Sequence, residues 1–172
     1  FRANLRAGAI ESSFEVPALD LHSLETLIES LNSERDDEVL ATLELLVAYD
    51  RARLVPALLL YHPSRAVVLR TCEILRKSGR TDYVSEARHL LEHADMDVRA
   101  SAMCALGSLL EPGELRAQLR RERSPATRAA VLVALVARKL DRDGAARREI
   151  DECAHGGSTA SRLALAGAVR LE

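Results

Sequence analysis

The chain has 172 residues, of which 48% are hydrophobic and only 3% aromatic, and its formal net charge is −2. This length allows one domain with a sizeable buried interior. The prevalence of Leu, Ala, Arg and Glu favours helices over a β-sandwich or barrel, which would need more β-branched and aromatic side chains. The near-neutral balance gives no reason to expect nucleic acid or an acidic membrane as partner, and apolar runs such as Leu54–Tyr61 are too short to cross a bilayer.

Residues 1–19 are polar and stand outside the repeated pattern described below, so we expect an N-terminal tether or partial capping segment there. Residues 20–172 are the predicted repeat domain. Because the chain begins with Phe rather than Met, we expect it to be a piece of a longer protein.

One helical pattern recurs along this domain. Each copy opens with a Ser or Asp, which are favoured helix N-caps, and then has apolar or small residues at positions four, eight, eleven and twelve, which form one helix face. The copies start at Asp36, Ser64, Asp95, Ser124 and Ser158, at successive offsets of 28, 31, 29 and 34 residues. The copy from Ser124, SPATRAAVLVALVARKL, is apolar nearly all round, so we expect that helix to be central and deeply buried.

A shorter helix is expected before each copy, separated from it by a short turn. These partner helices are predicted at Leu21–Leu31, Ala52–Tyr61, Asp82–His93, Glu114–Arg123 and roughly Asp143–Ala154. Breakers separate the pairs at Asn32-Ser33, Asp50, Ser78-Gly79, Pro112-Gly113 and Asp141 to Gly144. Short connections make successive helices antiparallel, and we expect a stack of about five pairs, 20–50, 51–79, 80–110, 111–141 and 142–172, that is, an α-solenoid.

The stretch DMDVRASAMCALGSL resembles the second helix of a short HEAT-like repeat, whose pattern is D-x-x-V-R-x-x-A-x-x-A-L-G. The matching residues are Asp95, Val98, Arg99, Ala102, Ala105, Leu106 and Gly107. The copies at Ser64 and Ser124 depart from the pattern, with Val68 in place of the Arg and Thr127 in place of the Val. The resemblance implies an all-α, right-handed superhelix over Leu21–Leu171 and says little about function.

A narrower resemblance concerns the string from LDLHSLETLIESLNS through ARLVPALLLYHPS. It is similar to HEAT segments attached to bacterial transporters of the nucleotide-translocase kind. There the repeats follow a membrane body, and a cyclic-nucleotide-binding module can follow them. In that setting the N-terminal segment 1–19 would be the tether from the membrane body.

The polar turn Tyr61-His62-Pro63-Ser64 is interpreted as the connection within one helix pair. Pro63 disfavours helical geometry at His62, and Ser64 can cap the next helix, whose apolar face begins at Val67. The cysteines, Cys72, Cys104 and Cys153, are far apart and fall within helical patterns, so we expect thiols in a reducing compartment rather than disulfides.

No catalytic or metal-binding constellation is expected. His89 and His93 have the four-residue spacing of a metal pair, but no third ligand is evident beyond Asp95 and Cys104. The HEAT-like di-iron hydroxylases need His-Glu pairs, and no His here precedes a Glu. We therefore expect no enzyme activity, no metal and no cofactor.

Three arginines, Arg99, Arg128 and Arg162, occupy the same place in their repeats. In the structural interpretation, each pairs with an acid or a helix-end carbonyl of the adjacent repeat. In the binding interpretation, the row presents guanidinium groups to carboxylates or phosphates of a partner. Charge is also uneven along the chain, because Asp20–Asp50 holds nine acids against Arg35, and Glu111–Arg148 holds ten basic residues against five acids. Such a gradient is typical of solvated faces, although it can orient a partner.

The expected function is a non-catalytic scaffold in the cytoplasm whose partner is another protein or an adjacent domain. One alternative is a regulatory segment of a bacterial transporter at the cytoplasmic face of the inner membrane, coupling the transporter to a ligand-binding module. A second alternative is a nucleic-acid-binding solenoid that uses the Arg-rich span from Arg116 to Arg148.

Overall fold

Helices account for all of the regular structure in residues 21–171, which are the residues that the computed structural model describes. The predicted segment 1–19 lies outside them. The elements in order are α1 (Leu21–Ser30), α2 (Asp36–Ala48), η1 (Ala52–Leu54), η2 (Ala57–Tyr61), α3 (Arg65–Lys77), α4 (Val84–Ala87), η3 (Arg88–Glu92), α5 (Met96–Leu106), α6 (Pro112–Arg121), α7 (Pro125–Ala137), α8 (Ala145–His155) and α9 (Thr159–Leu171). The expected all-α class is confirmed, and within residues 21–171 no helix is long and apolar enough to cross a membrane.

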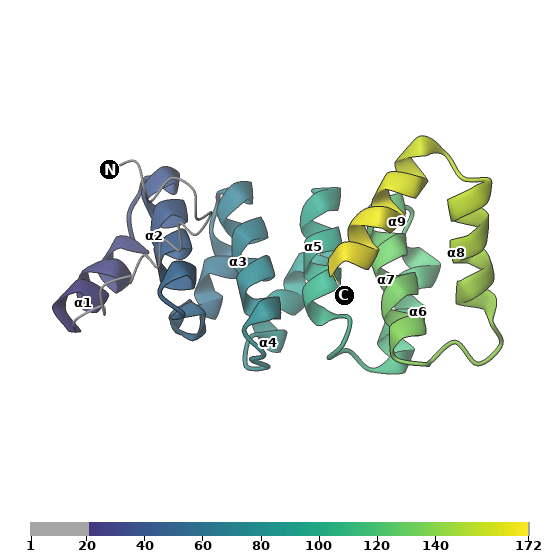
Figure 1. The fold of residues 1–172 in the computed structure, drawn as a ribbon, viewed down its shortest axis with the longest axis horizontal. Helices are drawn as coiled ribbons and strands as arrows, with labels where there is room; N and C mark the ends of the chain where they lie inside the picture. Colours follow the sequence, from purple (N-terminus) through teal and green to yellow (C-terminus); the bar gives the residue numbers. More distant parts are fainter. Residues whose placement is uncertain (1–20, 172) are drawn as a thin grey trace, which may run out of the picture.

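The helices that the repeated pattern predicts, here called the second helices, are α2, α3, α5, α7 and α9. Each packs against the next one along the chain. In Figure 1, α2, α3, α5 and α7 follow one another along the molecule, and α9 is drawn between α5 and α7, with the C-terminus beside α5. The first segments, which are α1, η1–η2, α4–η3, α6 and α8, each pack on the second helix that follows them. The second helices are therefore in continuous contact from α2 to α9.

The starts of the second helices agree with the pattern to within two residues, but their caps differ. The Asp95 carboxylate accepts the backbone N–H groups of Asp97 (2.8 Å) and Val98 (3.2 Å), and the Ser158 hydroxyl accepts that of Ser161 (3.1 Å), as expected for N-caps. Ser64 and Ser124 occupy N-cap positions without a side-chain capping bond, so their predicted capping role is wrong. Their turns are held by the side chain two residues earlier, as described below.

Two predicted first helices are irregular. The stretch Ala52–Tyr61 forms two 3₁₀ segments, because Pro56 has no N–H to donate and Val55 before it is extended (φ −63°, ψ 119°). The predicted Asp82–His93 helix is likewise one turn of α-helix, α4, followed by the 3₁₀ segment η3. In contrast, Pro112 starts α6 rather than breaking it, because the first helical position needs no donor.

Several connections between helices contain a residue with positive φ. Asp50 and Gly79 have positive φ (56° and 67°) at two predicted breakers, and Gly144 (φ 67°) ends the last of them, Asp141 to Gly144. Lys139 is a left-handed residue (φ 56°) that the sequence did not indicate. It closes α7 through a hydrogen bond of 2.8 Å from the Leu140 N–H to the Leu135 carbonyl, the six-to-one bond of a Schellman turn.

The core is centred on α7, as expected from its apolar sequence. Eight of its residues are buried, and it packs against α5, α6, α8 and α9. Gly107, at the end of α5, explains one residue of the HEAT-like pattern: a Cβ added there would lie 2.9 Å from the Ala134 Cβ on α7. The glycine lets two second helices approach closely.

This close approach gives the first prediction. Replacing Gly107 by Ala should lower the free energy of unfolding by about 1–3 kcal/mol, because the added methyl overpacks a rigid contact. Gly113→Ala is the matched control, since a Cβ at Gly113 meets nothing within 4 Å and Ala is the better helix former by up to ~1 kcal/mol. Urea unfolding of both variants gives the comparison, and a Gly107 variant as stable as the Gly113 variant would contradict the contact.

Candidate functional site

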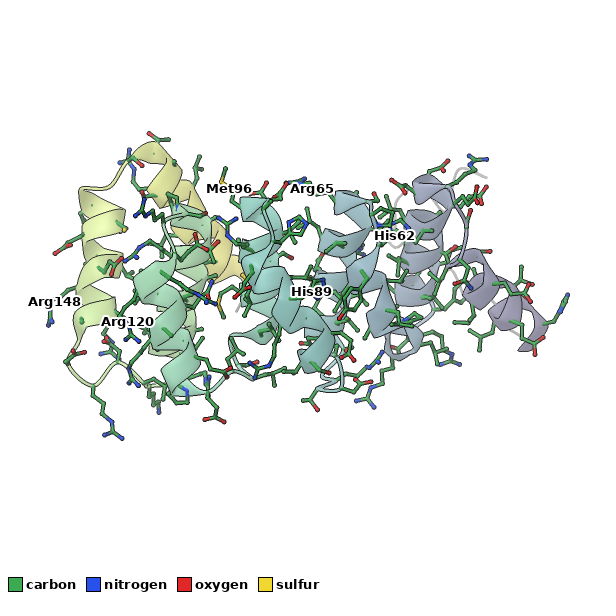
Figure 2. All side chains as sticks on the ribbon, turned by 180° about the vertical axis from the view of Figure 1, so that it is seen from behind. His62, Arg65, His89, Met96, Arg120 and Arg148 are labelled. Carbon is green, nitrogen blue, oxygen red and sulfur yellow. The ribbon has the colours of Figure 1, made fainter. Side chains whose placement is uncertain are left out.

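The turns that precede α3, α5 and α7 share a device that the sequence analysis missed. In each, the side chain two residues before the N-cap accepts the N–H of the N-cap residue. His62 Nδ1 accepts from Ser64 (3.1 Å), His93 Nδ1 from Asp95 (3.0 Å) and Glu122 Oε1 from Ser124 (2.8 Å). These acceptors are 31 and 29 residues apart. In Figure 2, His62, Arg65 and Met96 lie along one edge of the molecule, where α3 and α5 begin.

Glu122 is the most connected of these residues, although its side chain is only 6% exposed. Its carboxylate also accepts the Arg123 N–H (2.9 Å) and two bonds from the Arg99 guanidinium, at 3.0 Å from Nε and 3.3 Å from Nη2. Burial acts to raise the pKa of Glu122, but the Arg99 and backbone hydrogen bonds outweigh burial and hold this pKa below its usual value. The carboxylate is therefore charged and fully engaged at neutral pH.

Arg99 on α5 and Arg128 on α7 make equivalent bonds in successive helix pairs. Arg99 Nη1 donates to the carbonyls of His93 (2.8 Å) and Ala94 (2.9 Å), in the turn just after η3. Arg128 Nη1 donates to the carbonyls of Leu119 (2.8 Å) and Glu122 (3.1 Å), at the end of α6, and its other nitrogens pair with Glu149 of α8. Each arginine thus ties its own helix pair to an acid of the next pair along the chain.

Arg162 holds the equivalent place on α9 but is exposed. Its side chain makes no hydrogen bond or ion pair with another residue of the described part of the chain. The structure therefore places two of the three predicted arginines in inter-pair links and leaves the third on the surface. The guanidinium groups of Arg99 and Arg128 could bind a partner only by giving up these bonds.

His89 and His93, which have the four-residue spacing of a metal pair, make different contacts. The His89 ring stacks on the Tyr61 ring, with centroids 4.2 Å apart and planes at 4°, and its Nδ1 contacts the Glu86 carbonyl. His93 Nδ1 faces the Asp95 N–H. Among the described residues, no three His, Cys, Asp or Glu side chains gather where they could hold a metal ion.

The cysteines are free thiols in the structure. Cys72 is buried on α3, and burial raises the pKa of its thiol to about 12, so it is a poor nucleophile at neutral pH. Cys104 and Cys153 are partly buried.

A hollow of about 250 Å³ lies where α5, α7 and α9 meet. We call it the second-helix hollow. Its wall is built almost entirely from small side chains, which are Ala100, Ser101, Cys104, Ala126, Ala164, Gly167 and Ala168, with Asp97 at one end. Because α5, α7 and α9 all contribute to its wall, the hollow depends on how these three helices pack.

Other hollows surround the arginine links. Clefts of about 460 and 500 Å³ lie on either side of the Arg99–Glu122 pair, and both include Arg123. A narrower cavity of about 100 Å³ lies between α7, α8 and α9, beside the Arg128–Glu149 pair.

No known protein family, curated protein or solved structure matches this chain. Functional inference therefore depends on the geometry described above.

The arginine links give a second prediction, which compares three equivalent positions. Arg99→Ala should lower the free energy of unfolding by about 3 kcal/mol, because it leaves the buried Glu122 carboxylate without its charge partner. Arg128→Ala should cost less, since Glu149 is more exposed. Arg162→Ala should leave stability within about 0.5 kcal/mol of wild type. Urea unfolding measures all three, and equal effects at the three positions would contradict these assignments.

Glu122 gives a third prediction, on acid stability. A carboxylate whose pKa is lowered by folding stabilises the protein above its unfolded pKa, and this contribution is lost as pH falls through the folded pKa. Glu122→Gln keeps an acceptor oxygen but removes the charge, so the stability gap between wild type and variant should be largest near neutral pH and shrink as the pH falls below 4.5, the ordinary pKa of a glutamate. Urea unfolding at a series of pH values gives this gap directly. A gap that does not change with pH would contradict a charged Glu122.

Proposed function

We propose that the chain is a non-catalytic protein–protein interaction scaffold, built as a right-handed α-solenoid of HEAT-like pairs. The serial contact of α2, α3, α5, α7 and α9 supports this architecture. The inter-pair bonds of Arg99 and Arg128 support it as well, since they repeat from one pair to the next. A stack of this kind has contacts only between neighbouring units, and it presents a long surface that suits an extended partner.

The second-helix hollow is the observation that carries the proposal. Hot spots at protein interfaces are bulky side chains that fill a desolvated pocket on the partner. A wall of Ala, Ser and Gly side chains lets such an anchor approach the helix backbones, and the volume of about 250 Å³ has room for one large side chain. Asp97 at the end of the hollow adds a polar rim, which is also typical of interfaces.

The alternatives from the sequence, a transporter regulatory segment and a nucleic-acid-binding solenoid, remain predictions. A nucleic-acid complex would weaken steeply as salt rises, because binding releases counterions from the phosphates.

The scaffold proposal is tested by filling the hollow. Gly167 lines it, and a Cβ added at Gly167 meets nothing within 4 Å, so Gly167→Arg should fold normally while its side chain obstructs the hollow. Gly113→Arg on α6 is the control: it makes the same change at an equally open helical position outside the hollow.

Both variants and the wild type are used as bait in quantitative affinity capture from the source cells. Proteins that wild type and Gly113→Arg enrich, but Gly167→Arg does not, are expected if the hollow is a binding surface. Identical sets for all three baits would contradict the proposed binding surface.

A further inference from the structure

A second surface lies between α1 and η1. A groove of about 390 Å³ runs there, lined by Leu24, Ile28 and Leu54, with Glu25 and Glu29 along it. It forms beside an irregular segment, because Pro56 divides the stretch Ala52–Tyr61 into two short 3₁₀ segments, and η1 contributes just one residue to the groove wall. Local departures from a regular pattern are expected mainly at functional sites.

The same irregular stretch exposes large apolar side chains. Leu54 is 41% exposed, Leu58 74% and Tyr61 57%, whereas Leu59 and Leu60 between them are buried. Of these three side chains, Leu54 lines the groove, whereas the Tyr61 ring stacks on His89 of η3. A large apolar side chain left exposed in the wall of an apolar groove is typical of a binding surface. This exposure indicates a surface that another molecule covers.

The charge of this surface defines its partner. The side chains of Glu25 and Glu29 form no hydrogen bond or ion pair with any other described residue. They lie four residues apart on α1, as do Leu24 and Ile28, so acidic and apolar groups repeat together at each helical turn. The surrounding stretch Asp20–Asp50 has nine acids against one basic residue, so the long-range field has the same sign.

We propose that this groove binds a basic amphipathic helix of a partner protein, with its apolar stripe in the groove and its Lys or Arg residues on Glu25 and Glu29. A helix fits better than a strand because the groove repeats with the pitch of α1, and an amphipathic helix presents apolar and charged residues at this same spacing. The inference rests on the proposed scaffold function and names one class of partner for it.

The test uses the 172-residue chain and two fluorescein-labelled synthetic peptides of about 15 residues, or about four helical turns. Both have Leu on one face; one carries Lys on its flanks and the other Glu in the same places. Fluorescence anisotropy at low salt should show the Lys peptide binding at least about tenfold more tightly than the Glu peptide. The preference should decrease as salt screens the charges.

Variants locate the binding. Glu25→Lys and Glu29→Lys should each weaken the Lys peptide severalfold, and the double variant should bind the Glu peptide in preference. Glu34→Lys, which makes the same charge change at an exposed residue outside the groove, should have a much smaller effect. Leu54→Ser should weaken the binding of both peptides, because it removes an apolar side chain from the groove wall. Circular dichroism of each variant confirms that the helices are retained.

Two results would overturn the inference. One is equal affinity of wild type for both peptides; the other is an equal loss for Glu34→Lys and Glu29→Lys, which would indicate non-specific charge attraction. Concentration-dependent dimerisation in sedimentation velocity, lost in Glu25→Lys, would instead assign the groove to a second copy. Gly167→Arg should bind the Lys peptide normally, so failure of the groove and failure of the second-helix hollow are told apart.

Discussion

The buried Glu122 carboxylate is the constraint on which the middle of this structure depends. It ends α6, fixes the start of α7 through the Ser124 N–H, and holds the Arg99 guanidinium of α5. Its backbone carbonyl also accepts a bond from Arg128, the arginine of the next link. A charge with 6% exposure is tolerated because the Arg99 guanidinium and the backbone N–H groups of Arg123 and Ser124 all donate to it. One side chain therefore sets the register of three consecutive helices.

The surfaces follow from this arrangement. Gly107 allows α5 and α7 to approach closely, and each second helix contacts the next one along the chain. The second helices carry small residues near α9, which is why the second-helix hollow exists. The first segments have fewer mutual contacts, and there the break at Pro56 exposes apolar side chains beside the acidic face of α1. The two proposed binding surfaces thus have different physical origins, which are backbone proximity in one and irregular structure in the other.

The uneven charge of the chain is partly absorbed by these links. Towards the C-terminus, Arg99 pairs with Glu122 and Arg128 pairs with Glu149. On α1, in the acidic part, Glu25 and Glu29 face solvent without a described partner. Glu122 and Glu149 are therefore occupied by arginines of the same chain. Glu25 and Glu29 are free to attract a positively charged group of another molecule.

The sequence by itself determined the helical class, the starts of the second helices and the central position of α7. These depend on local rules, namely the 3.6-residue apolar period, capping residues and turn breakers, which act within a few residues of each other. The same rules also located Arg99, Arg128 and Arg162 at equivalent places. They could not tell which of these arginines would find an acid, because Glu122 and Glu149 are 23 and 21 residues away in sequence.

Tertiary structure alone decided the rest. The acceptors at the turns are two histidines and one glutamate, so their common role is invisible in residue identity and appears only when each meets an N–H two residues on. The length of the helix at Ala52–Tyr61 depended on whether packing could overcome Pro56, and it did not. The second-helix hollow and the groove between α1 and η1 depend on the spacing between helices from different pairs. This spacing is set by side-chain packing between the helices rather than by any local pattern.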